Sequence, residues 1–158
     1  MTGMPKSFIA GLIFALGACV SGGGETKPLA PLAEDADQPL LALFEHVLTN
    51  HLATFGPDTP TTCAVLRTGP LDAEQEDALI ARFVRLAPAS RCRAEGGNWR
   101  DTVTGQPAQV VEVYEFACRA PDQCTGWVAA PGSSAKRYAM GFEDGAWRFT
   151  ADPRTIAE

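Results

Sequence analysis

Carboxylates and imidazoles within apolar stretches are the side chains of this chain best placed for acid–base chemistry. Glu112 and Glu115 interrupt the longest strand that the sequence predicts, and His51 lies near the apolar stripe of a predicted helix. An apolar pocket around such a carboxyl would raise its pKa and make it a candidate general base. With Trp127, these residues are the candidate lining of a ligand pocket. The alternative is exposed or hydrogen-bonded carboxylates and a tryptophan that packs in the core.

Two further patterns suggest enzymatic chemistry but lack the surroundings it needs. Ser133-Ser134-Ala135-Lys136 matches the Ser-x-x-Lys motif of penicillin-recognising enzymes, in which the serine opens a helix. Here the tetrad follows Pro131-Gly132 and precedes an alternating strand, which indicates a hairpin tip. His46 and His51 lie about 140° apart around one helix and cannot share a metal ion from it. We therefore assign no catalytic residue, no metal site and no cofactor.

The amino-terminal segment resembles the signal peptide of a bacterial lipoprotein. Lys6 precedes an apolar segment, residues 8–18, which is shorter than the roughly 20 residues needed to span a bilayer. Leu16-Gly17-Ala18-Cys19 closes this segment and is similar to a lipobox. The resemblance implies that Cys19 is the acylated first residue of the mature protein. The alternative is an ordinary cleaved secretory signal with an incidental cysteine.

This resemblance also implies a location. Acyl chains on Cys19 would anchor the protein to a membrane of the bacterial cell envelope, on the periplasmic side. Val20 stands where an aspartate would favour retention in the inner membrane, so the outer membrane is favoured. The expected partners are the membrane itself and an envelope protein.

Composition divides the chain into three parts. Residues 1–18 are the expected signal peptide, and residues 19–36 are rich in Gly, Pro and Ala, which is typical of a flexible tether. Residues 37–158 have the length of one globular domain with a single core.

The charge pattern excludes one class of partner and leaves another open. The formal net charge is −6, so we expect no binding to nucleic acid. Basic residues nevertheless crowd into the middle of the chain and form either a solvated face or a local site for an anionic partner. They are Arg67, Arg82, Arg85, Arg91, Arg93 and Arg100.

Four cysteines remain after Cys19 is set aside, and an even number in an oxidising compartment indicates disulfides. Three pairings are possible, and the turn signal Pro121-Asp122 favours Cys118 with Cys124 across a hairpin. Cys63 would then pair with Cys92. Zinc is the competing interpretation, but zinc ligand pairs usually lie closer in sequence than Cys118 and Cys124 do.

Hydrophobic periodicity predicts two helices in the first half of the domain. Residues 37–55 repeat apolar side chains at helical spacing, with Asp37 as the expected cap. Residues 61–68 read as a short strand. The second helix begins at Asp72, which forms a capping-box pattern with Gln75, and ends before Pro88.

The second half of the domain alternates between strands and turns. Strands are expected over residues 99–103, 108–119, 124–130 and 136–142, with a last strand after Asp144-Gly145. The apolar phase slips between Val113 and Tyr114, which indicates a bulge. Counting away from the Cys118–Cys124 pair in steps of two residues on each strand places Phe116 near Gly126 and Tyr114 near Val128.

These elements predict an α+β fold in which two helices pack on one face of a curved antiparallel sheet, an α+β roll. The element order is similar to that of cystatin-like and NTF2-like proteins. Residues 84–92 and Gly145-Ala146-Trp147 also resemble segments of small uncharacterised secreted bacterial proteins. Neither resemblance implies an activity.

Three functions stay open at this point. The first is a non-enzymatic envelope lipoprotein that acts as an accessory, binding or assembly factor. The second is a small-molecule-binding or weakly catalytic roll with a pocket between helix and sheet. The third is an inhibitor of a secreted hydrolase, which would use the disulfide-bonded loop 119–123.

Overall fold

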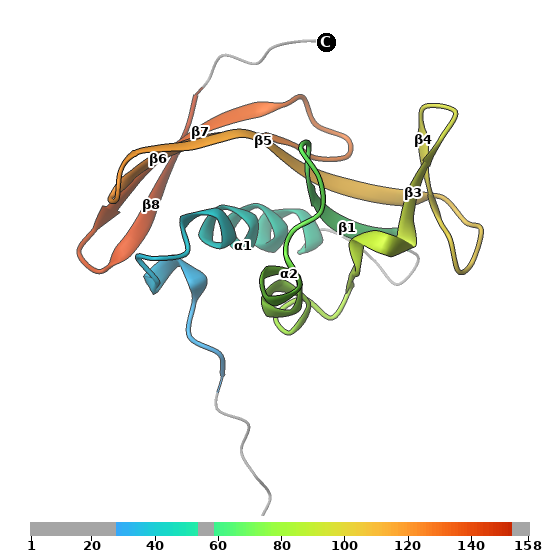
Figure 1. Ribbon diagram of the computed structural model, residues 1–158, viewed down its shortest axis with the longest axis horizontal. Helices are drawn as coiled ribbons and strands as arrows, with labels where there is room; N and C mark the ends of the chain where they lie inside the picture. Colours follow the sequence, from blue (N-terminus) through green and yellow to red (C-terminus); the bar gives the residue numbers. More distant parts are fainter. Residues whose placement is uncertain (1–27, 54–58, 153–158) are drawn as a thin grey trace, which may run out of the picture.

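A computed structural model describes residues 28–53 and 59–152, so Cys19 and the expected signal peptide lie outside the described residues. The fold is α+β, as predicted. A curved six-stranded sheet with the order β2-β1-β5-β6-β7-β8 wraps around helix α1, and strands β3 and β4 form a separate two-stranded sheet (Figure 1). Within the described residues, no helix is long and apolar enough to cross a membrane.

Four strands form the predicted antiparallel meander. They are β5 (Ala108–Ala120), β6 (Gln123–Ala129), β7 (Lys136–Glu143) and β8 (Ala146–Ala151). Strand β6 alternates strictly between buried and more exposed residues, because successive side chains point to opposite faces of a sheet.

The prediction of an antiparallel sheet is wrong for the other edge. Strand β1 (Thr61–Leu66) pairs in parallel with both β5 and β2 (Leu86–Ala87). Parallel pairing needs a long crossover, and the chain between β1 and β5 supplies it through helix α2 and the β3–β4 hairpin. The sheet is therefore mixed.

The β3–β4 hairpin stands at one end of the sheet. It comprises β3 (Cys92–Glu95) and β4 (Asn98–Asp101), joined by Gly96 and Gly97 with φ angles of 58° and 83°. Two residues with positive φ make the tight turn that glycine adopts without strain. The predicted strand at 99–103 thus pairs with the residues before it.

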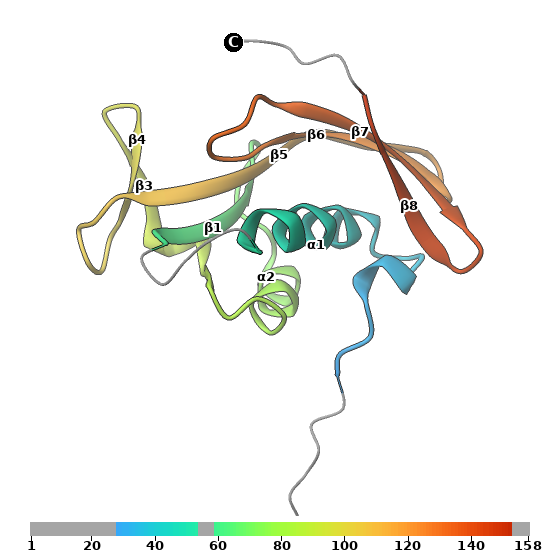
Figure 2. The ribbon, with the colours of Figure 1, turned by 180° about the vertical axis from the view of Figure 1, so that it is seen from behind.

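Helix α1 (Pro39–Leu52) lies in the hollow of the curved sheet, as both ribbon views show (Figures 1 and 2). The predicted cap is wrong: Gln38 occupies the N-cap without a side-chain hydrogen bond, while Pro39 takes the first helical position. The helix is held by its apolar face, which packs against the sheet in the main core. Its buried residues are Leu41, Ala42, Leu43, Phe44, Val47 and Leu48.

Helix α2 (Ala73–Ile80) begins with the predicted capping box. The Gln75 backbone N–H donates to Asp72 Oδ1 at 2.8 Å, and the Asp72 N–H donates to Gln75 Oε1 at 3.3 Å. The helix ends at Ile80, well before Pro88, because the chain turns there and places Leu86 beside Thr62 on the sheet edge. Both helices lie on the concave side of the sheet (Figures 1 and 2).

The folded part begins before residue 37. A 3-10 turn at Leu32–Glu34, labelled η1, buries Leu32 in the main core. The Trp147 indole N–H donates to the Asp35 carbonyl at 2.8 Å, and the Ala33 N–H donates to Glu45 at 3.2 Å. Residues 32–35, which the composition assigned to the tether, are therefore held against the domain.

Both predicted disulfides are present. Cys118 and Cys124 lie opposite each other on β5 and β6, and Cys63 bonds to Cys92 in a second, smaller core between β1 and the β3–β4 hairpin. The predicted bulge lies between Tyr114 and Ala117.

The bulge changes the register that simple pairing predicts. Glu115 has a φ of 50°, and Tyr114 pairs with Trp127, not with Val128. The extra residue shifts every pair beyond it, so Phe116 has no direct partner in the register. Phe116 nevertheless lies near Gly126, as predicted, because a Cβ added to Gly126 would be 3.0 Å from the Phe116 ring.

Candidate functional site

The four residues proposed as a pocket lining do not come together. Glu112 and Trp127 lie on the convex side of the sheet, Glu115 is exposed at the bulge, and His51 lies at the end of α1 on the concave side. The sequence could not show this, because Tyr114 and Glu115 straddle the bulge that changes the phase of the strand.

The concave side is filled by packing between α1 and the sheet. The side chains of Leu43, Phe44 and Leu48 are fully buried there, together with Val111 and Val113 of β5. Two hollows on this side open around the end and outer surface of the helix.

His51 lines the smaller of these hollows, which has a volume of about 210 Å³. Desolvation lowers the pKa of His51, and a side-chain hydrogen bond with Gln109 opposes that shift. Ser133 and Lys136 line the same hollow, but Ser133 lies in the predicted turn, where its hydroxyl donates to the Ala130 carbonyl at 3.1 Å.

His46 lines a larger hollow of about 530 Å³ on the outer surface of α1. Its ring stacks on Phe149 with centroids 4.3 Å apart, and burial lowers its pKa. The neighbouring Glu45 forms an ion pair with Arg82 at 3.3 Å. These contacts tie the helix to β8 and to the segment after α2.

One buried carboxylate, Asp101, is fully shielded from solvent, although no pattern in the sequence indicates it. Arg91 forms a salt bridge with it, and the Thr61 hydroxyl donates to it at 2.6 Å. The Val103 N–H donates to Asp101 Oδ1 at 2.9 Å. The arginine and these donors hold the pKa of Asp101 well below its usual range, so the carboxylate is charged and fixes the hairpin to β1.

The crowded arginines are largely neutralised by carboxylates. Arg67, Arg82, Arg91 and Arg100 form ion pairs with Glu112, Glu45, Asp101 and Glu95, respectively. The structure therefore favours the interpretation that the basic stretch serves packing and solubility over that of a site for an anionic partner.

The convex side carries a stack that crosses three strands. We call the convex side of β5–β8, with the adjoining end of β1, the outer face. The Arg67 guanidinium lies 3.7 Å from the centroid of the Tyr114 ring, and Tyr114 stacks on Trp127 at 6.1 Å with an angle of 8° between the rings. Glu112 accepts from Arg67 at 2.8 Å. Arg137 follows Trp127 on the next strand of the sheet.

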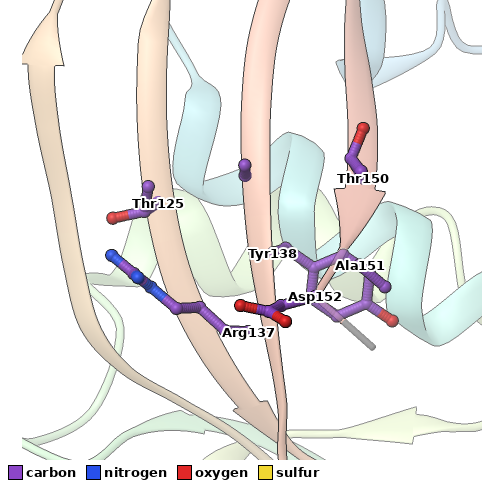
Figure 3. A pocket seen from close by; sticks show the side chains of 7 residues that line it. Thr125, Arg137, Tyr138, Thr150, Ala151 and Asp152 are labelled. Atoms are coloured by element: carbon purple, nitrogen blue, oxygen red, sulfur yellow. The ribbon is translucent and has the colours of Figure 1, made fainter. Parts of the chain in front are cut away.

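A shallow hollow of about 290 Å³ lies beside this stack. Figure 3 views it with the strands in front of a helix, and Thr125, Arg137, Thr150 and Asp152 surround it (Figure 3). Ala139, on the middle strand, lies opposite Thr125 on one side and Thr150 on the other. The sequence did not single out these residues, because side chains spread over three strands form no linear motif.

Among residues 28–53 and 59–152, no group of three or more His, Cys, Asp or Glu side chains could hold a metal ion. No family model, curated protein or solved structure matches the chain.

Proposed function

We propose that this protein is a lipid-anchored domain of the bacterial cell envelope that works by binding, through the outer face of its sheet. The anchor is the acylated Cys19 that the lipobox resemblance implies, and Val20 favours the outer membrane. The similarity to the cystatin-like and NTF2-like element order belongs to the same proposal.

The observation that carries the binding role is the stack of Arg67, Tyr114 and Trp127 on the outer face. Trp, Tyr and Arg are the residues enriched at binding hot spots, because they offer large rigid surfaces with a polar group. Here the rings are half-buried, and Trp127 alternates along β6 with Gly126 and Val128, which face the core, so it points away from the helices, and Tyr114 opposite it does the same. Both ribbon views show the two helices on the concave side of the sheet (Figures 1 and 2). A protein that used its sheet only to cover the helix would need no aromatic stack on this side.

Anchoring is tested by the Cys19→Ser variant of the full chain in bacterial cells. The unchanged chain should fractionate with membranes and carry a mass increment from its acyl chains. The variant should lose both properties. An unchanged chain without acylation would contradict the anchor.

Binding is tested by a photo-crosslinking residue placed at one of two exposed positions, Ala139 on the outer face or Glu74 on α2. We expect crosslinked adducts from position 139, and far fewer after Trp127→Ala. Trp99→Ala is the matched control, because Trp99 is an exposed tryptophan on the β3–β4 hairpin. Equal adducts from both positions, or none from position 139, would overturn the proposed binding face.

A further inference from the structure

The hollow on the outer face has a regular construction from three neighbouring strands. Thr125 of β6, Ala139 of β7 and Thr150 of β8 lie directly opposite one another in the register. We call these three residues the hydroxyl row. The small side chain of Ala139 leaves space between the two threonines, and the hollow of about 290 Å³ forms over it.

A second row runs parallel to the first, two residues along each strand. Trp127 lies opposite Arg137, and the Asp152 backbone N–H donates to the Arg137 carbonyl at 2.8 Å. Residues two apart on one strand share a face and lie about 7 Å from each other. Trp127 therefore lies beside the hydroxyl row on the same face of the sheet, next to the residues that line the hollow itself.

Side chains of opposite charge line the hollow together. In Figure 3 the Arg137 guanidinium extends toward Thr125, and the Asp152 carboxylate lies on the other side of the Arg137 stem (Figure 3). The two threonine hydroxyls can each donate and accept, the guanidinium only donates, and the carboxylate only accepts. A ligand that fills this hollow meets both donors and acceptors within one small area.

From this arrangement we infer that the hollow binds an uncharged saccharide, presented as a glycan strand. Ring hydroxyls are both donors and acceptors and match the threonines, Arg137 and Asp152. The apolar C–H face of a sugar ring matches an indole, whose π face is electronegative. This inference rests on the proposed function, since it names the ligand of the same outer face.

The charges on the outer face disfavour the other ligand classes. Arg67 is paired with Glu112, and Arg137 lines the hollow with Asp152, so neither sign of charge dominates. A polyanion would meet both carboxylates within a chain of net charge −6, and a polycation would meet both arginines. A lipid tail or apolar peptide would bury the two threonine hydroxyls without the hydrogen bonds of water.

The test is a binding titration of the full chain in detergent, with tetramers of N-acetylglucosamine and of glucose as soluble probes and purified cell-wall sacculi as the polymeric probe. Poly-glutamate is the polyanion control. We expect saturable binding to at least one of the saccharide probes and none to poly-glutamate. Trp127→Ala should weaken that binding about tenfold, by removal of the stacking surface.

A second variant distinguishes loss of binding from loss of folding. Ala139→Leu fills the hollow at an exposed position and leaves the sheet register intact. It should abolish saccharide binding while the urea midpoint of unfolding stays close to that of the unchanged chain, as it does for most exposed substitutions. Trp99→Ala should bind like the unchanged chain.

Three results would overturn the inference: no binding to any saccharide probe, equal binding by the Ala139→Leu variant, or preferential binding to poly-glutamate. If no saccharide probe binds while position 139 still forms specific crosslinks in cells, the inferred glycan ligand is wrong and the proposed binding face is retained. If both fail, the proposed function fails with it.

Discussion

Removing the Cys63–Cys92 disulfide should destabilise the domain more than removing the Cys118–Cys124 disulfide. The first bond joins residues 29 apart in sequence, and the second joins residues 6 apart. A disulfide restricts the unfolded chain, and the entropy it removes grows with the length of the loop it closes. The two bonds thus offer a comparison within one protein.

The loop lengths give the magnitude. At 25 °C the loop-closure relation yields about 3.6 kcal/mol for a separation of 29 and about 2.2 kcal/mol for a separation of 6, a difference of about 1.4 kcal/mol. Packing acts in the same direction, because Cys63 and Cys92 are both buried in the second core, whereas Cys118 is exposed and only Cys124 is buried.

The assay is equilibrium urea unfolding of two double variants, each with both cysteines of one bond changed to alanine. Both carry Cys19→Ser, so that each retains one possible disulfide. Tryptophan fluorescence reports unfolding, and the free energy in water follows from linear extrapolation. Mass measurement of the unreduced protein confirms the remaining bond.

Equal losses from the two double variants, or a larger loss from the variant without the short loop, would refute this reasoning. Such a result would mean that the disulfides do not stabilise the protein mainly by restricting the unfolded chain, or that the β5–β6 hairpin depends on its own disulfide.

Three further substitutions test separate parts of the structure by urea unfolding. Asp101→Asn should lower the free energy of unfolding most above about pH 4 and progressively less at lower pH, because the lowered pKa of Asp101 makes its charge stabilise the folded state above the pKa of the unfolded chain. A loss of free energy that does not depend on pH would contradict this. Asp72→Ala should cost about 1 kcal/mol through loss of the capping box, and no cost would contradict the cap. Gly126→Val should cost about 1–3 kcal/mol, because a Cβ there lies 3.0 Å from Phe116 and 3.1 Å from Leu43; a neutral result would show that both side chains move aside.

The elements that sequence predicts best are those set by local chemistry. The meander follows from alternation and from turns such as Asp144-Gly145, and the cap of α2 follows from Asp72 and Gln75 alone. The Cys118–Cys124 bond follows from its own turn. In each case the deciding residues lie within about ten positions of one another.

The features that the sequence did not predict depend on contacts between distant parts of the chain. Strand β1 pairs with β5 more than 40 residues later in the chain, and nothing in the residues 61–66 specifies a parallel neighbour. The early end of α2 likewise depends on the pairing of Leu86 with Thr62. Asp101 lies among polar residues in the sequence and is buried only because Arg91 and Thr61 meet it in the fold.

The candidate site was missed for a related reason. Trp127 was singled out as a pocket residue, but its neighbours Tyr114 and Arg137 come from two other strands, and the bulge at Glu115 moves Tyr114 into register with it. A surface built across strands becomes visible only once the register is known.

The binding face is tested most directly by amide chemical-shift mapping of the full chain in detergent during titration with the N-acetylglucosamine tetramer. The largest shifts should fall on the hydroxyl row, Thr125, Ala139 and Thr150, and on the backbone and indole N–H of Trp127. Shifts confined to α1 around His46 and His51, or no shifts at saturating saccharide, would contradict the proposed binding face.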